Sequence, residues 1–154
     1  MLNSVYAAQH KHHFTFAGYE VKTTGNPLAH AILRGAVSKH GNTVQNYHYE
    51  DLIRLHEMYE SMDLVNPACI VDANHSNSNK DYKQQPRIVR EVMNSRNYSS
   101  DIKNLVKGVM VESYLIEGCQ KISDHQTYGQ SITDPCLGWE DSKKLIYMMA
   151  ELNK

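Results

Sequence analysis

The segment Ala68-Cys-Ile-Val-Asp-Ala-Asn-His75 decides the fold, because an apolar run of strand length ends there on polar residues. Similar runs precede and follow it, namely Leu28-Ala-His-Ala-Ile-Leu-Arg-Gly35 and Lys107-Gly-Val-Met-Val-Glu112. None of the three alternates strictly between polar and apolar residues. Such runs are typical of parallel strands that are buried on both faces. The sequence therefore predicts a parallel sheet that contains these three strands.

Helical segments are predicted after each strand, over about 49–62, around 86–93 and from 141 onward, the last after a long loop. Ser78 or Asn79 is expected to cap the second helix, with Pro86 near its start. The alternation of strand and helix predicts the α/β class with right-handed crossovers. The apolar residues of each helix recur at helical spacing: Leu52, Leu55, Tyr59 and Met62; Ile88, Val89, Val92 and Met93; Leu145, Met148, Met149 and Leu152.

Arg34, His75 and Glu112 each stand at the carboxyl end of an apolar strand, 41 and 37 residues apart. In a (β/α)8 barrel the active groups project from that end of the strands into one mouth. The sequence thus predicts part of such a barrel, with three βα units over 28–154 and a lead-in with a β-hairpin over 1–27. A full barrel needs eight units, so the remaining strands are expected from the same polypeptide or from another chain.

Composition narrows the class of protein. The 154 residues, about one domain, carry 16 Lys+Arg and 17 Asp+Glu, a net charge of -1. This balance argues against a protein that binds nucleic acid through bulk positive charge. No apolar stretch approaches the roughly 20 residues of a membrane helix. Three cysteines without a CxxC pair favour free thiols in a reducing compartment. A cytoplasmic protein with neither nucleic-acid nor membrane partners is expected.

Three residues form a candidate metal-ligand set. His75, Glu112 and Asp134 offer nitrogen and oxygen donors that suit Mn, Fe, Co or Zn. Their spacing alone does not bring them together. Alternatively, His75 is a loop histidine that is hydrogen-bonded to a neighbouring residue, and Asp134 is a turn residue before Pro135. Glu112 directly follows a buried strand, where a carboxylate needs a cation or hydrogen-bond donors.

Arg34 is a candidate anion-binding residue. Its planar guanidinium suits a phosphate or carboxylate in the barrel mouth, and Gly35 allows a ligand close approach to the backbone. An internal ion pair is the alternative. Asp72, three residues before His75, is placed either to orient that histidine or to make a plain strand-end hydrogen bond.

Four motifs in order carry a family resemblance, which runs from about residue 11 to 154. They are Thr23-Thr-Gly-Asn-Pro with His30-Ala-Ile-Leu-Arg-Gly35, Asp72-Ala-Asn-His-Ser-Asn-Ser78, Gly108-Val-Met-Val-Glu-Ser113 and Ser131-Ile-Thr-Asp-Pro-Cys-Leu-Gly-Trp-Glu-Asp141. Together they resemble the carboxyl-terminal part of class I 3-deoxy-D-arabino-heptulosonate 7-phosphate (DAHP) synthase. The resemblance implies a metal-dependent barrel enzyme that condenses phosphoenolpyruvate with erythrose 4-phosphate. The products are DAHP and phosphate, in the first step of the shikimate pathway to aromatic amino acids.

The resemblance also implies roles for individual residues. His75, Glu112 and Asp134 match three of four metal ligands. The fourth is a cysteine on the first barrel strand, which no cysteine of this chain matches. Arg34 and His75 match catalytic residues that contact phosphoenolpyruvate, and Asp134 lies near the sugar aldehyde.

The hairpin matches a region that binds an aromatic amino-acid effector in feedback-inhibited members of the family. Phe14, Phe16 and Val21 fall at the matching places, although the hairpin is about five residues shorter than in the enterobacterial enzymes. The family usually forms homo-oligomers.

Two alternative functions are also compatible with the sequence. Because the resemblance places a metal ligand and most phosphate contacts in the amino-terminal half, the chain alone is expected to be inactive. It is alternatively a non-catalytic remnant or an assembly partner of a DAHP synthase. The ligand set considered alone also fits a metal-dependent hydrolase.

Overall fold

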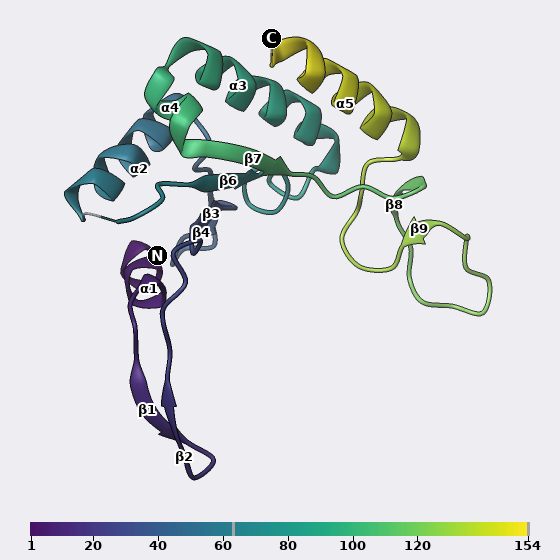
Figure 1. The fold of residues 1–154 in the computed structure, drawn as a ribbon. Coiled ribbons are helices and arrows are strands. Elements are labelled where there is room, and N and C mark those ends of the chain that lie inside the picture. The colour runs from purple at the N-terminus through teal and green to yellow at the C-terminus, as the bar shows by residue number, and fades with distance from the viewer. Residues whose placement is uncertain (63, 154) are drawn as a thin grey trace.

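The three apolar runs form the central sheet of a mixed α/β chain. The computed structural model describes residues 1–62 and 64–153 (Figure 1). β3 (Ala31–Leu33), β6 (Cys69–Asp72) and β7 (Val106–Met110) lie in the order β3-β6-β7, and both pairs are parallel. The predicted parallel sheet and its alternation with helices are therefore confirmed, with shorter strands than the sequence suggested.

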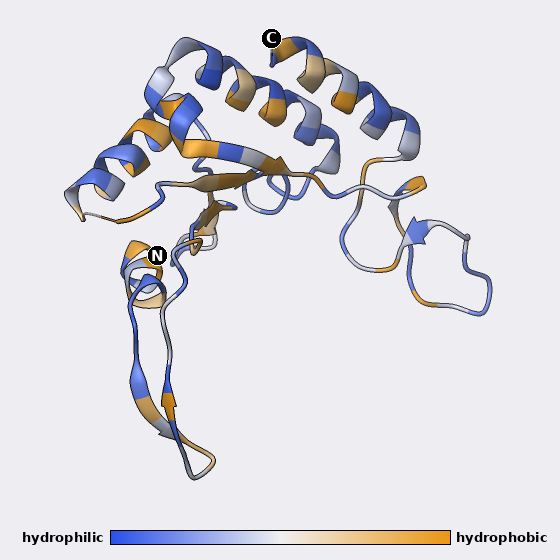
Figure 2. Cartoon of the chain, in the orientation of Figure 1, coloured by the Kyte–Doolittle hydropathy of each residue, from blue (hydrophilic) through white to orange (hydrophobic). Residues whose placement is uncertain are grey.

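Helices cover one side of this sheet (Figure 1). α2 (Tyr49–Ser61), α3 (Gln85–Tyr98) and α4 (Ser100–Leu105) bury apolar residues in the core, and α5 (Trp139–Leu152) packs beside α3. Figure 2 shows hydrophilic and hydrophobic residues interspersed along these helices. The core lies between the two layers because burial of these apolar side chains is the main favourable contribution to folding. It includes Leu33, Leu52, Leu55, Val71, Ile88, Val89, Val92, Ile102 and Val106.

The other face of the sheet is more exposed than the sequence predicted. Side chains alternate between the two faces of a strand. Leu33 is buried under the helices, whereas Ile32 keeps 42% of its surface exposed and Met110 keeps 44%. The expectation of burial on both faces is wrong for these residues because α2, α3, α4 and α5 all lie on the same side.

Local hydrogen bonds explain two differences at element boundaries. The first strand begins at Ala31 instead of Leu28, because Asn26 accepts the backbone N–H groups of Leu28 and Ala29 in a turn. The expected cap at Ser78 or Asn79 is wrong. Asp81 instead caps the short 3-10 helix η1 (Tyr82–Gln84), which leads into α3.

The segment after β7 also contains more structure than the predicted long loop. β8 (Ile116–Cys119) and β9 (Gln130–Ser131) pair in parallel within it, and α5 begins at Trp139, two residues before the predicted position. A second small pair, β4 (Ala36–Val37) and β5 (Thr43–Val44), lies between β3 and α2.

The amino-terminal part contains the predicted hairpin and an unpredicted helix. β1 (His13–Phe16) and β2 (Tyr19–Lys22) pair antiparallel and project from the rest of the chain (Figure 1). Phe14 lies opposite Val21, and the side chain of Phe16 is exposed. α1 (Leu2–Gln9) precedes the hairpin. None of the helices among the described residues is long and apolar enough to cross a membrane.

Gly35 is a position where both the backbone conformation and the close packing require glycine. Its φ is +71°, and an added Cβ would lie 2.7 Å from Ser76 Cβ and 2.8 Å from Val44 O. Gly41 is a matched control, because its φ is +82° but an added Cβ meets no described atom within 4 Å. We expect Gly41→Ala to lower the free energy of unfolding by about 1 kcal/mol, and Gly35→Ala by about 2–4 kcal/mol. Equal losses in urea unfolding would contradict the close packing at Gly35.

Candidate metal centre

The parallel register places the predicted site residues at one edge of the sheet. Leu33 pairs with Val71, and Asp72 pairs with Met110. Arg34, His75 and Glu112 follow these strand ends, so their backbones all leave the sheet at its carboxyl edge.

Backbone hydrogen bonds return a distant segment to the same edge. The Leu137 N–H donates to Glu112 O at 3.0 Å, and the Tyr114 N–H donates to Leu137 O at 2.8 Å. This pairing carries the preceding turn, Ser131 to Cys136, back toward the end of β7. Asp134 in that turn therefore reaches the strand ends from outside the sheet.

The structure brings His75, Glu112 and Asp134 together. One potential ligand atom from each lies within 4.8 Å of the other two. His75 Nε2 is 3.2 Å from Glu112 Oε1 and 3.8 Å from Asp134 Oδ2. His75 and Glu112 are half-buried, whereas Asp134 is exposed. An imidazole nitrogen with two carboxylate oxygens is a donor set that fits a divalent transition metal.

Asp72 lies behind the imidazole. Its Oδ2 is 2.8 Å from His75 Nδ1, and its Oδ1 accepts the Asn74 N–H at 2.9 Å. The contact with Nδ1 is close but poorly aligned, and Nδ1 is buried without a well-formed hydrogen bond. His75 also has a positive φ of +54°. This carboxylate position agrees with the orienting role considered for Asp72, because a carboxylate behind a ligating histidine fixes its ring.

Two buried amides that the sequence did not single out contact Glu112. Asn74 Nδ2 donates to Glu112 Oε2 at 2.6 Å. Gln85 accepts the Glu112 N–H at 2.8 Å and donates to Glu112 O at 3.1 Å. In the sequence, Asn74 looks like an ordinary loop residue after a strand, and Gln85 looks like an ordinary helix-start residue before Pro86. Only the tertiary structure places their amides at Glu112.

Arg34 lies at the same edge without joining the ligand cluster. Its side chain is exposed and makes no hydrogen bond or ion pair with any residue that the structure describes. The alternative of an internal ion pair is therefore not realised among residues 1–62 and 64–153. The guanidinium remains available for an external anion.

Two asparagines tie the loop of Arg34 to that of His75. Asn77 is fully buried and donates to Leu33 O at 3.1 Å and to Asp72 O at 2.8 Å. Its Oδ1 accepts the Asn46 N–H at 2.9 Å, and Asn46 Oδ1 accepts the Gly35 N–H at 2.8 Å. These bonds satisfy buried carbonyl groups and fix the relative position of the two loops.

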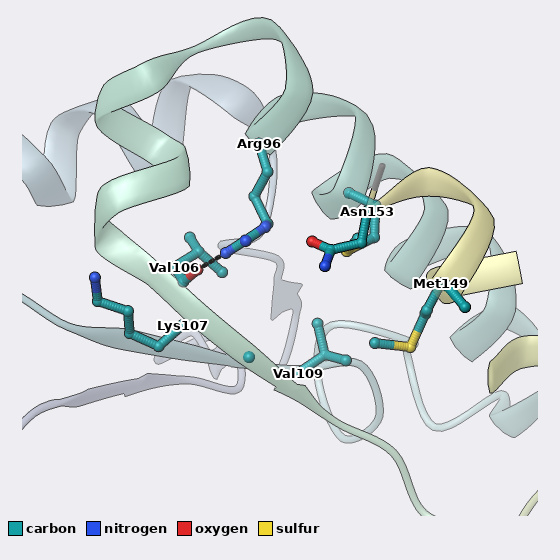
Figure 3. Close-up of a pocket in the computed structure, with 9 residues that line it drawn as sticks. Arg96, Val106, Lys107, Val109, Met149 and Asn153 are labelled. Atoms are coloured by element: carbon teal, nitrogen blue, oxygen red, sulfur yellow. Dashed lines mark hydrogen bonds between the residues drawn. The ribbon is translucent and has the colours of Figure 1, made fainter. Parts of the chain in front are cut away.

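A separate hollow lies along β7 and is distinct from this cluster (Figure 3). It occupies about 330 Å³ between β7, α3 and α5. In Figure 3 the Arg96 side chain extends from α3 and donates to the carbonyl oxygen of Val106, the first residue of β7. The Arg96 guanidinium is thus bonded to the backbone of β7. None of the three candidate ligands lines the hollow.

The fold and the cluster define an α/β protein with a candidate divalent-metal centre at the carboxyl edge of a parallel sheet. The model of the DAHP synthetase I family matches residues 2–146. Because the match covers most of the sequence, the chain belongs to this family.

Individual relatives agree with this assignment. The chain is 40% identical to a phospho-2-dehydro-3-deoxyheptonate aldolase of Haemophilus influenzae, over 97% of this chain and 41% of the relative. It is 39% identical to the Trp-sensitive phospho-2-dehydro-3-deoxyheptonate aldolase of Escherichia coli K12, over 84% of this chain and 35% of the relative. A solved structure of the phospho-2-dehydro-3-deoxyheptonate aldolase of Francisella tularensis SCHU S4 matches with a TM-score of 0.84 and 31% sequence identity. The match covers 98% of this chain and 43% of that structure. The chain thus spans about two fifths of the length of the relatives it matches.

The three cysteines should differ in reactivity. Burial in β6 raises the pKa of the Cys69 thiol to about 12, so only about one in 10,000 is a thiolate at pH 8. Burial also raises the pKa of Cys136, and the charges of Glu112 and Asp134 raise it further. Cys119 is exposed. With an aromatic disulfide reagent at pH 8, we expect Cys119 to react first, Cys136 more slowly and Cys69 only after denaturation. Rapid labelling of native Cys69 would contradict this order.

Proposed function

We propose that this chain forms part of the active site of a DAHP synthase, which condenses phosphoenolpyruvate with erythrose 4-phosphate to give DAHP and phosphate. This reaction is the first step of the shikimate pathway. Membership of the DAHP synthetase I family supports the proposal. The observation that carries it is the convergence of His75, Glu112 and Asp134 at the carboxyl edge of the sheet.

The proposed architecture is the carboxyl-terminal part of one (β/α)8 barrel domain, with the lead-in and hairpin at 1–27 and three βα units at 28–154. The outer edges of β3 and β7 pair with no described strand. Unpaired strand edges expose backbone donors and acceptors that seek further strands. The remaining strands would come from the rest of the barrel, in the same polypeptide or in a second one.

His75, Glu112 and Asp134 would hold a divalent Mn, Fe, Co or Zn ion. When bound, the ion would supply a Lewis acid that polarises the aldehyde of erythrose 4-phosphate. The half-buried position of His75 and Glu112 limits competition from water for their ligand atoms. Asp134 is the exposed member of the set and would also face the sugar aldehyde.

Arg34 would bind the anionic groups of phosphoenolpyruvate beside His75. The site contains the carboxylates of Asp72, Glu112 and Asp134, and their negative charge repels an anionic substrate. The free guanidinium at the same edge offsets part of this repulsion and forms bidentate bonds with a carboxylate or phosphate. Arg34 and His75 are thus the catalytic residues of the proposal.

The proposal extends to the whole protein. We infer a cytoplasmic homo-oligomer, with an aromatic amino-acid effector bound at Phe14, Phe16 and Val21 of the hairpin. The exposed rings of Phe14 and Phe16 support this inference, because they offer apolar surface that a ligand or a second subunit would cover.

Metal binding can be measured directly on the 154-residue chain. We expect calorimetric titration with Mn²⁺ to give one site per chain. Loss of a ligand in His75→Ala or Glu112→Gln should weaken binding at least about tenfold. Glu117→Gln is the control, because Glu117 is an exposed glutamate of β8 outside the cluster. Equal binding by all of these variants would place the metal elsewhere.

Catalysis can be tested in a chimera in which this chain replaces the matching segment of the Haemophilus influenzae aldolase. We expect formation of DAHP and release of phosphate, with loss of at least about a hundredfold in His75→Ala, because one residue contributes both to the metal site and to the substrate site. Arg34→Ala should chiefly raise the KM for phosphoenolpyruvate.

Arg54→Ala provides the control for Arg34→Ala, since Arg54 is an exposed arginine of α2. A chimera with native helical content and thermal stability but no turnover would favour the non-catalytic reading. Turnover that persists after metal removal would contradict the role of the ligand cluster.

A further inference from the structure

We propose that Asn74 and Gln85 are positioning residues, which hold Glu112 so that a single carboxylate oxygen, Oε1, faces the metal site. The inference rests on the proposed function, because it concerns how that site is held in shape. It adds two residues to the three ligands and assigns the two Glu112 oxygens different tasks.

Gln85 fixes the backbone of Glu112. The strand pairing of β7 ends at Met110, so the Glu112 peptide lies beyond the ladder. Gln85, fully buried at the start of α3, bonds both the N–H and the C=O of Glu112 with its side-chain amide. A side-chain amide carries the same donor and acceptor groups as a peptide. Gln85 thus accepts the Glu112 N–H beyond the end of the ladder and shares the Glu112 C=O with the Leu137 N–H.

Asn74 fixes the carboxylate of Glu112. Its Nδ2 donates to Glu112 Oε2 at 2.6 Å, and the Asn74 side chain is almost fully buried. The hydroxyl of Ser78 donates to Asn74 Oδ1 at 2.7 Å. This second bond sets the orientation of the amide, because the oxygen side is occupied by a donor and the nitrogen side must face the glutamate.

The two contacts leave one oxygen of Glu112 for a metal. Oε2 is occupied by Asn74, whereas Oε1 lies 3.2 Å from His75 Nε2. A carboxylate without these bonds would rotate, and part of the binding free energy would be spent on ordering it. Partners that orient a ligand in this way typically contribute 10–100-fold to metal affinity.

The test is a Co²⁺ titration of the chimera with the Haemophilus influenzae aldolase, which supplies the rest of the proposed barrel, followed by calorimetry and by visible absorption. Gln85→Met keeps the side-chain length but removes both bonds to the Glu112 peptide, and Asn74→Ala removes the bond to Oε2. We expect each to weaken Co²⁺ binding by roughly 10–100-fold and to change the absorption spectrum of the bound ion. Ser78→Ala, a milder change, should weaken binding in the same direction by a few-fold.

Val92→Ala is the matched control, because Val92 is fully buried on α3 but makes no bond to Glu112. It should lower the thermal midpoint and leave the Co²⁺ affinity and spectrum unchanged. An equal loss of affinity in Val92→Ala would overturn the inference, since stability alone would explain the effect.

Two further outcomes separate the inference from the proposed function. If the chimera without these substitutions binds no Co²⁺, the proposed metal site fails and the inference falls with it. If this chimera binds Co²⁺ and its Asn74, Gln85 and Ser78 variants bind it equally well with the same spectrum, the metal site stands and the inference is overturned. If Asn74→Ala or Gln85→Met fails to fold, the Co²⁺ affinity and absorption spectrum of Ser78→Ala decide the question. Values unchanged in Ser78→Ala would then overturn the inference.

Discussion

The parallel pairing of β6 with both β3 and β7 is the constraint on which the site depends. Parallel strands end at the same edge, so three residues from separate parts of the sequence leave the sheet together. The core under α2 and α3 fixes the strands, and the register then fixes where Arg34, His75 and Glu112 begin. Side-chain hydrogen bonds complete the arrangement: Asn77 joins two loops, and Gln85 holds the peptide beyond the end of β7.

The electrostatics of this edge favour a bound cation. Asp72, Glu112 and Asp134 surround a single imidazole. Among residues 1–62 and 64–153, amide N–H groups donate only to Glu112 Oε2 and Asp72 Oδ1 of these carboxylates. Mutual repulsion of nearby carboxylates opposes the folded arrangement unless a positive charge offsets it. A divalent ion at His75, Glu112 and Asp134 would remove that cost, and folding and metal binding would then be coupled.

The parts of the site that could be predicted from the sequence are those fixed by strand ends. His75 and Glu112 follow apolar runs, and their convergence needs only a parallel sheet. Asp134 is a candidate by residue type and by family resemblance, but its spacing does not place it beside the other two, because its position depends on the bond from Leu137 to Glu112, 25 residues along the chain. Asn74 and Gln85 were not predicted, because an amide that satisfies a buried peptide looks like any polar loop residue. Hydropathy also could not show that the helices of this chain cover only one face of the sheet.

That uncovered face and the candidate site belong together. Residues two apart on a strand point to the same side. Arg34 therefore continues the side of exposed Ile32, and Glu112 continues the side of exposed Met110. Structure that buries the two apolar side chains would also enclose the guanidinium and the ligand cluster. In the proposed barrel, the burial that stabilises the sheet would at the same time exclude water from the site and strengthen its charge interactions. The same missing strands would then add to the stability of the sheet and complete the catalytic site.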